Sequence, residues 1–233
     1  MGNKQPISIL KIGGNIIDNP SELEQFLSDF SKIEGYKVLV HGGGKSATKM
    51  AQSIGLVPQM IDGRRITDAA MLDVVVMIYA GQINKEVVAQ LQANGSNAMG
   101  FSGADGNLIL SEKRNHPTID FGFVGDVKKV NTSLLSNLLE TGITPVFCAI
   151  THDGKGQLLN TNADTIASEL AIALSSFYDV TLTYCFEKQG VLFDAEDDSS
   201  VIEAINPDLY ANTVHELNQV VMGNNFSPIV ASR

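Results

Sequence analysis

The sequence predicts an α/β protein built on an open, mostly parallel sheet sandwiched by helices. Two observations support this prediction. Short runs rich in β-branched residues alternate with longer segments whose apolar residues recur at helical spacing. In addition, two connections between an expected strand and the next helix, at 13–14 and 42–44, are rich in glycine. Turns of this kind are typical of the carboxyl ends of parallel strands.

Each expected element follows from a local pattern. The first strand covers 7–12, and the first long helix starts at Asn19, a preferred N-cap residue, with Pro20 at the first helical position. Further strands are expected at 37–40, 97–102, 144–150 and 180–186, with a hairpin at 121–130 and an irregular or hairpin segment at 58–68. Further helices are expected at 45–54, 69–92, 133–140 and 162–174.

Composition excludes several classes of function. The 233 residues are 44% hydrophobic and 18% charged, which is ordinary for a globular protein. The formal net charge of −10 disfavours a nucleic-acid partner, because phosphate binding requires clustered Lys and Arg. No apolar run is long enough to cross a membrane, so we expect a cytoplasmic protein. Cys148 and Cys185 lie in apolar runs and are interpreted as buried hydrophobes, with no metal site expected.

The two glycine turns are the sharpest chemical feature. Glycine lets backbone N–H groups approach an anion closely, and a following helix N-terminus favours negative charge. Both turns would open at the same edge of a parallel sheet, so together they suggest two anionic groups held side by side. Lys11 ends the first strand beside one of these turns. A lysine in an apolar strand is costly unless it meets an anion, so we favour a functional role.

Two further segments carry candidate polar residues. Arg65 belongs to a polar segment and could bind a carboxylate through two hydrogen bonds, although an exposed structural arginine is the simpler interpretation of that residue alone. Asn162 and Asp164 suit the cap and first turn of a helix, which leaves Asn160 unexplained. His41 is interpreted as structural. Leu39 stands where the first glycine of a P-loop belongs, so that motif is absent.

Four ordered segments resemble one family. KIGGN, LVHGGGKSA, DGRRIT and LLNTNADTIASELA are similar to the motifs of acetylglutamate kinases, which have the amino-acid kinase fold. The resemblance implies an N-terminal lobe for the acylated amino acid, residues 1–175, and a C-terminal lobe for ATP, residues 176–233. It also implies transfer of the ATP γ-phosphoryl group to the side-chain carboxylate of N-acetyl-L-glutamate in arginine biosynthesis, with Mg²⁺.

The resemblance also implies residue roles. Lys11 would stabilise the transferring phosphoryl group, and Asp164 would orient the catalytic lysines. The glycines Gly13 and Gly14 would supply backbone donors, while Gly43 and Gly44 would face the acyl-amino acid. Arg65 would hold the α-carboxylate, and Asn160 would bind the same substrate. Residues near the nucleotide would be Glu187, Lys188 and Gly190. A carboxylate nucleophile with a pKa of about 4.3 is already ionised, so no general base is required.

The carboxyl-terminal part departs from the family pattern. The family carries a Gly-Met-x-x-Lys segment whose lysine also contacts the phosphoryl group, whereas Lys188 is the last lysine here. We expect an internal omission between about Ala211 and Asn212. Three alternatives stay open: N-succinyl-L-glutamate as substrate, another acceptor such as carbamate, glutamate or aspartate, and a catalytically silent binding protein. Because Lys11 lies near the start, we expect a homodimer without arginine feedback.

Overall fold

The computed structural model describes residues 4–61, 64–186, 190, 192, 194, 197 and 199–202. Its centre is a five-stranded sheet in the order β11–β1–β2–β8–β5. All neighbouring strands in this sheet are parallel. The strands are β1 (Pro6–Ile12), β2 (Tyr36–His41), β5 (Ala98–Phe101), β8 (Thr144–Cys148) and β11 (Asp179–Cys185). The predicted parallel α/β architecture is therefore confirmed.

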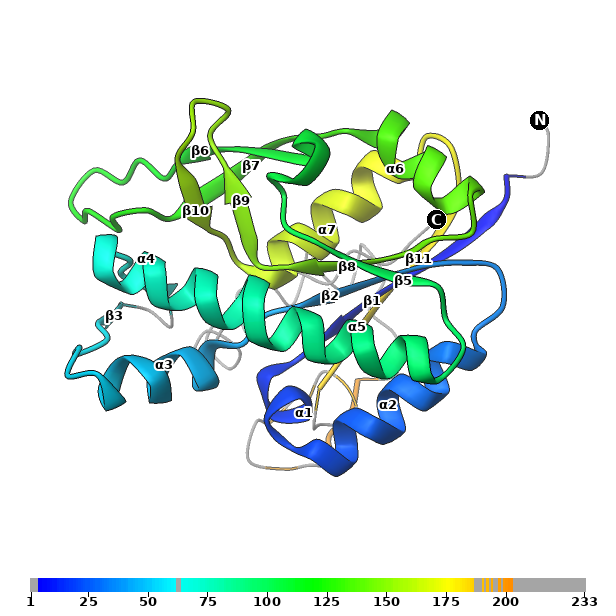
Figure 1. Ribbon diagram of the computed structural model, residues 1–233, viewed down its shortest axis with the longest axis horizontal. Coiled ribbons are helices and arrows are strands. Elements are labelled where there is room, and N and C mark those ends of the chain that lie inside the picture. Colours follow the sequence, from blue (N-terminus) through cyan, green and yellow to red (C-terminus); the bar gives the residue numbers. More distant parts are fainter. Residues whose placement is uncertain are drawn as a thin grey trace.

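Helices cover both faces of this sheet, which explains why its strands are apolar on both sides. In β1, the buried residues Ile9 and Leu10 are adjacent in sequence and therefore point to opposite faces. Figure 1 shows α6 (Thr132–Glu140) and α7 (Ala163–Leu174) on one side of the sheet, with α2 (Pro20–Lys32) and α5 (Asn84–Ala93) on the other. Asn19 caps α2 as predicted, because its side chain accepts a hydrogen bond from the Ser21 N–H at 3.3 Å.

A second, four-stranded sheet lies beside α7 in the order β10–β9–β6–β7. Its strands are β6 (Ile109–Lys113), β7 (Gly125–Val130), β9 (Ile150–His152) and β10 (Leu158–Asn160). The hairpin predicted within 121–130 is wrong, because only β7 forms there and its antiparallel partner is β6. The strand predicted over 144–150 is also divided: β8 stays in the central sheet, and β9 enters the second one.

The long helix predicted over 69–92 is continuous but changes its winding. It consists of α4 (Ala69–Val75), a π-helical segment η1 (Val76–Ile83) and then α5. The wider π turn adds a residue to each turn, and π segments occur mostly near functional sites. The remaining short elements are α1 (Gly14–Asp18), α3 (Gly44–Ser53), η2 (Asp105–Asn107) and the two-stranded ribbon β3 (Met60–Ile61) with β4 (Arg64–Arg65).

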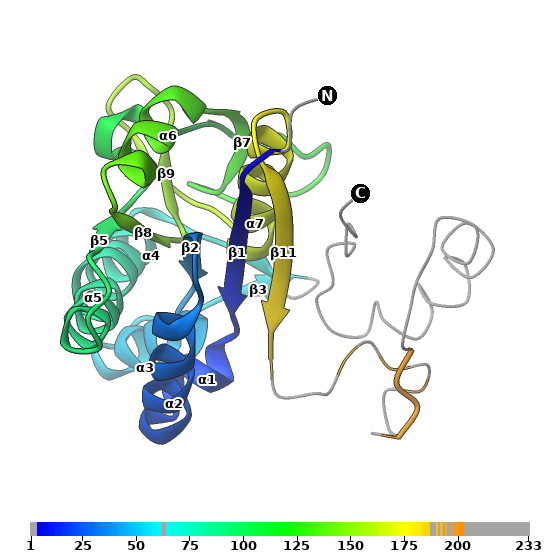
Figure 2. The same ribbon diagram turned by 90° about the vertical axis from the view of Figure 1, so that its right-hand side faces the viewer.

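The segment after residue 175 joins the same central sheet. β11 runs beside β1 along its whole length, from the Pro6–Asp179 pair to the Ile12–Cys185 pair, as Figure 2 shows. The boundary proposed between lobes thus falls between α7 and β11. The omission expected near 211/212 lies outside the described residues. Within the described part of the chain, every helix is too short or too polar to span a lipid bilayer.

Candidate active site

A pocket of about 230 Å³ lies where β1 and β2 end. Seven of the residues predicted from sequence line it: Lys11, Gly14, Gly43, Gly44, Arg65, Asn160 and Asp164. These residues come from strands, turns and helix starts that are far apart in the chain. The carboxyl edge of a parallel sheet brings them together, since all strands of such a sheet end on the same side.

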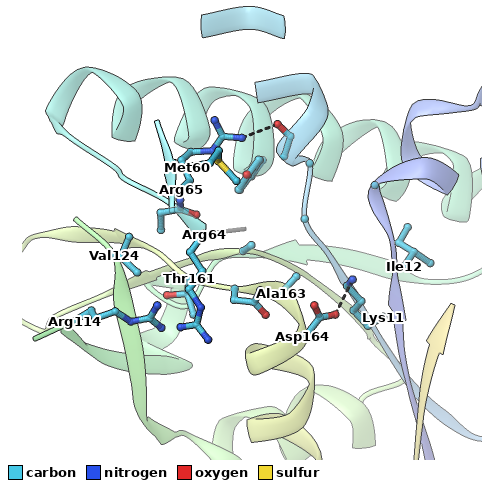
Figure 3. Close-up of a pocket in the computed structure, with 18 residues that line it drawn as sticks. Lys11, Ile12, Met60, Arg64, Arg65, Arg114, Val124, Thr161, Ala163 and Asp164 are labelled. Carbon is cyan, nitrogen blue, oxygen red and sulfur yellow. Dashed lines mark hydrogen bonds and ion pairs between the residues drawn. The ribbon is translucent and has the colours of Figure 1, made fainter. Parts of the chain in front are cut away.

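Lys11 and Asp164 form the charged end of the pocket. The Lys11 Nζ atom lies 2.7 Å from Asp164 Oδ1, and their side chains are only 17% and 22% exposed. Figure 3 shows this ion pair between the end of β1 and the start of α7. Asn162 caps that helix as predicted, because its Oδ1 accepts from the Thr165 N–H at 2.9 Å. The lysine at the end of the buried strand is therefore paired with an anion.

The glycine turn before α3 depends on the absence of side chains. Gly43 has φ of +152°, which L residues rarely adopt, and a Cβ there would lie 2.4 Å from Ile83 Cδ1 and 2.9 Å from Tyr79 Cδ1. The π-helical segment that holds Tyr79 thus packs directly against the turn. Gly43 and Gly44 both line the pocket beside the start of α3.

In the first glycine turn, Gly13 and Gly14 have different contacts. The Gly13 N–H donates to the Cys185 carbonyl at 2.9 Å, which ties the turn to β11. Gly13 is not among the pocket-lining residues, and its N–H is engaged by that carbonyl, whereas Gly14 lines the pocket. A Cβ on Gly14 would meet no atom within 4 Å, so the space beside it is open.

Arg65 is buried, which the simpler interpretation of that residue did not anticipate. Its side chain is 9% exposed, and Nη2 donates to the Gly44 carbonyl at 2.9 Å and to Thr48 Oγ1 at 2.8 Å. In the part of the chain that the structure describes, Arg65 makes no ion pair with a carboxylate. A buried guanidinium held by neutral acceptors carries an uncompensated charge, which favours an anionic ligand.

Asn160 lies at the end of β10 and is held by a neighbouring segment. Its Nδ2 donates to Thr67 Oγ1 at 3.0 Å. Thr67 is fully buried, and its backbone bonds to the Phe121 carbonyl and the Phe123 N–H. The second sheet therefore positions Asn160 at the pocket that Arg65 also lines, which accounts for a residue that helix capping left unexplained.

His41 lies behind the glycine turn and is completely buried. Its Nδ1 donates to the Gly42 carbonyl at 2.9 Å, and its Nε2 accepts from Asn84 Nδ2 at 3.0 Å. The second Nδ2 proton of Asn84 goes to the Val146 carbonyl. Burial lowers the pKa of His41 to about 4, so the ring is neutral at pH 7. These contacts support a structural role and not that of a catalytic base.

The pocket residues that sequence reasoning did not single out include Tyr79, Arg64 and Arg114. Tyr79 is buried in η1 and faces Arg65, and burial raises the pKa of its hydroxyl. Arg64 precedes Arg65 and was visible in the same motif, but no residue near Arg114 marks it in the sequence. Among the described residues, and counting Lys11 and Arg65, four cationic side chains line the pocket, and Asp164 is the single anionic one. It is thus strongly cationic in a chain whose net charge is −10.

The residues expected near the nucleotide are only partly visible. Glu187 and Lys188 lie outside the described residues. Gly190 is described but does not line this pocket, and a Cβ on it would lie 2.9 Å from Val201 Cγ1. Among the described residues, no group of three His, Cys, Asp or Glu side chains could hold a metal ion. Burial raises the pKa of the Cys148 thiol to about 12, which agrees with its interpretation as a buried hydrophobe.

Sequence comparison assigns the chain to a known family. The family model described as "Amino acid kinase family" matches residues 6–224. An acetylglutamate kinase of Phocaeicola vulgatus is 56% identical over 211 residues, which is 91% of this chain and 82% of that protein. One of Cytophaga hutchinsonii is 58% identical over 207 residues, which is 88% and 78% of the two chains. The chain therefore belongs to the amino acid kinase family. Within it, the chain groups with the acetylglutamate kinases, which are phosphotransferases that act on a carboxyl group.

Solved structures give the same fold. The structure of smu.665 from Streptococcus mutans has a TM-score of 0.74 and 24% sequence identity, and the match covers 93% of this chain and 83% of that one. At this level of identity the similarity supports the amino acid kinase fold alone.

Proposed function

We propose that this chain transfers the γ-phosphoryl group of ATP to the side-chain carboxylate of an N-acylated glutamate, with N-acetyl-L-glutamate as the substrate that its relatives' names indicate. The Lys11–Asp164 ion pair is the observation that carries this proposal. It fixes a cationic ammonium group at one end of the pocket, and Arg65 and Asn160 lie at the same cavity to bind a carboxylate.

The acceptor would lie between these groups. Its α-carboxylate would accept hydrogen bonds from Arg65 and Asn160, which leaves its side-chain carboxylate directed toward Lys11. An oxygen of that carboxylate attacks the γ-phosphorus, the bond from phosphorus to the ADP oxygen breaks, and an acyl phosphate and ADP result. The carboxylate is ionised at neutral pH, so no residue has to accept a proton from it. The chain needs only to position the two substrates and to neutralise their negative charges.

ATP and Mg²⁺ fit the donor set of the pocket. Lys11 and Gly14, at the end of β1 and the start of α1, would provide an ammonium donor and a backbone N–H donor for phosphate oxygens, whereas Gly43 and Gly44 would face the acceptor. Mg²⁺ is held in most kinases mainly by the phosphates and water, and it neutralises phosphate charge when bound. Within the pocket, the Asp164 carboxylate is already paired with Lys11, so Asp164 would orient that lysine rather than hold the metal.

One sequence feature favours a second candidate, a binding protein without turnover: no lysine follows Lys188. The test is ADP release from ATP and Mg²⁺ with N-acetyl-L-glutamate, L-glutamate and L-aspartate as acceptors. Turnover with the acylated substrate alone supports the kinase. If calorimetry detects N-acetyl-L-glutamate binding but ADP release stays at background, the binding protein is correct.

A further inference from the structure

The proposed reaction leaves two arginines of the pocket without a role. Arg64 and Arg114 both line the cavity, beside Val124. In Figure 3 their side chains extend toward the same end of the pocket, while Lys11 and Asp164 lie at the opposite end. One end therefore carries the phosphoryl-transfer pair, and the other carries two guanidinium groups.

The two guanidinium groups are held differently. Arg114 follows β6 and is fixed, because its Nε donates to both carboxylate oxygens of Asp126 on β7 at 3.0 and 3.2 Å and its guanidinium lies 5.6 Å from the centre of the Phe121 ring. Arg64 lies on β4 opposite Ile61 and is exposed. Within the described ranges the Arg64 side chain makes no hydrogen bond or ion pair, so it can turn toward a ligand.

The charges at this end are not balanced. Asp126 compensates Arg114, and Arg64 adds a second positive charge that no described carboxylate compensates. Two like charges that share one end of a pocket repel each other, and an anion between them removes that cost. The chain has ten more acidic than basic groups by formal charge, so carboxylates were available to pair with Arg64.

The substrate orientation proposed above determines which group meets these arginines. With the α-carboxylate at Arg65 and the side-chain carboxylate toward Lys11, the acyl group on the nitrogen extends toward the remaining end. An acetyl group ends in a methyl, which offers a guanidinium no acceptor. Met60 and Val124 also line the pocket and would contact methylene groups.

We propose that the acyl group preferred by this chain ends in a carboxylate, so that the substrate is glutamate acylated by a short dicarboxylic acid. Arg64 and Arg114 bind the free carboxylate of that acid. N-Succinyl-L-glutamate, with two methylene groups before the carboxylate, is the probe. This inference rests on the proposed kinase function and names its substrate class more closely.

The first experiment compares kcat/KM for three acceptors: N-acetyl-, N-succinyl- and N-succinamoyl-L-glutamate. The succinamoyl compound has the length of the succinyl one, with a neutral amide in place of the carboxylate. We expect the succinyl substrate to exceed the other two by about tenfold or more, because charge-assisted hydrogen bonds to a guanidinium are the strong ones. Equal or better turnover of the acetyl substrate would overturn this inference and leave the kinase function intact.

Variants of Arg64 test whether this residue causes the preference for the succinyl substrate. Arg64→Leu is expected to lower the succinyl-to-acetyl ratio of kcat/KM by about tenfold, and Arg64→Lys to restore part of it. Lys49→Leu is the matched control, since Lys49 is an exposed cation on α3 that does not line the pocket, and its loss should leave the ratio unchanged. An unchanged ratio in Arg64→Leu contradicts the assignment.

Binding provides a readout that does not depend on turnover. Isothermal titration of the wild type should give a Kd for N-succinyl-L-glutamate about tenfold below that for N-acetyl-L-glutamate, and Arg64→Leu should remove the difference. If neither compound is phosphorylated, the kinase proposal fails while this comparison still decides the acyl group. Equal affinities in the wild type would refute the inference.

Discussion

The Lys11 Nζ atom lies 2.7 Å from Asp164 Oδ1, and this contact joins the carboxyl end of β1 to the first turn of α7. The ion pair fixes a long, flexible side chain in one position before any ligand binds. A lysine held in this way loses little further freedom when a phosphoryl group arrives, which is the advantage of a preorganised site.

Replacement of Lys11 should affect turnover more than binding. A contact that is strongest in the transition state lowers kcat when it is removed, so we expect Lys11→Ala to reduce kcat by about 100-fold or more, with KM for the acceptor changed far less. Steady-state kinetics measures both constants. Lys32→Ala is the control, because Lys32 forms an exposed pair with Asp29 on α2. Equal kcat in Lys11→Ala and wild type would exclude the proposed role.

Asp164 should act through Lys11. We expect Asp164→Asn to lower kcat because the ammonium group is no longer held in place, by about 10-fold to 100-fold. The double variant Lys11→Ala/Asp164→Asn should have nearly the same kcat as Lys11→Ala alone. Asp164 acts by holding Lys11, so its replacement has no further effect once the lysine is absent. Fully additive losses in this cycle would show that Asp164 works independently of the lysine.

Arg65 should contribute to both substrate affinity and stability. Its guanidinium donates to neutral groups of the protein, namely the Gly44 carbonyl, the Thr48 hydroxyl and the Met71 sulfur, and an acceptor carboxylate would add a charge-assisted bond. Arg65→Ala is therefore expected to raise KM for the acyl-amino acid by about 10-fold to 100-fold, since such bonds contribute about 1.5–3 kcal/mol. Thr48→Val removes one partner and keeps the charge, so its KM should change much less. A rise in KM for ATP alone would contradict the assignment.

Replacement of glycine by alanine should destabilise the protein at Gly43, where a side chain does not fit, and not at Gly14, where there is space for one. At Gly43, a Cβ would meet Ile83 and Tyr79 in a backbone conformation with φ of +152°, so Gly43→Ala should destabilise the fold by more than about 1 kcal/mol. At Gly14, where the added Cβ meets nothing within 4 Å, the free energy of unfolding should stay within about 0.5 kcal/mol of wild type. Urea denaturation measures both. Equal stabilities would mean that the turn before α3 relaxes easily.

The buried His41 should make stability depend on pH. Its pKa in the fold is about 4, below its ordinary 6.5, so the unfolded chain binds more protons between these values. The contribution to stability is complete above pH 6.5 and is lost as the pH falls toward 4, by about 3 kcal/mol in total.

Urea denaturation at pH 7, 6, 5 and 4 tests this dependence. His41→Gln should remove the part of the pH dependence of the unfolding free energy that His41 causes, whatever the stability of this variant at pH 7. The control His116→Gln alters an exposed histidine and should keep the slope. If His41→Gln and the wild type show the same pH dependence, another group titrates.

Features that depend on neighbours in sequence could be predicted. The Asn19 and Asn162 caps and the glycine turns follow from backbone preferences that act within a few residues. The order of the motifs was likewise sufficient to identify the family. The β6–β7 pair could not be predicted, because its register depends on a partner from another part of the chain and includes an irregularity between Leu110 and Ser111.

The sequence by itself thus determined the alternation of strands and helices, both glycine turns and the candidate residues that accompany them. Only the tertiary structure decided that Arg65 is buried, that Gly13 bonds to Cys185, and that Arg64 and Arg114 line the same pocket. The physical reason is that burial and electrostatic environment depend on segments that fold against one another. Local preferences act over a few residues, whereas the charge of a pocket is the sum over side chains that the sheet brings together.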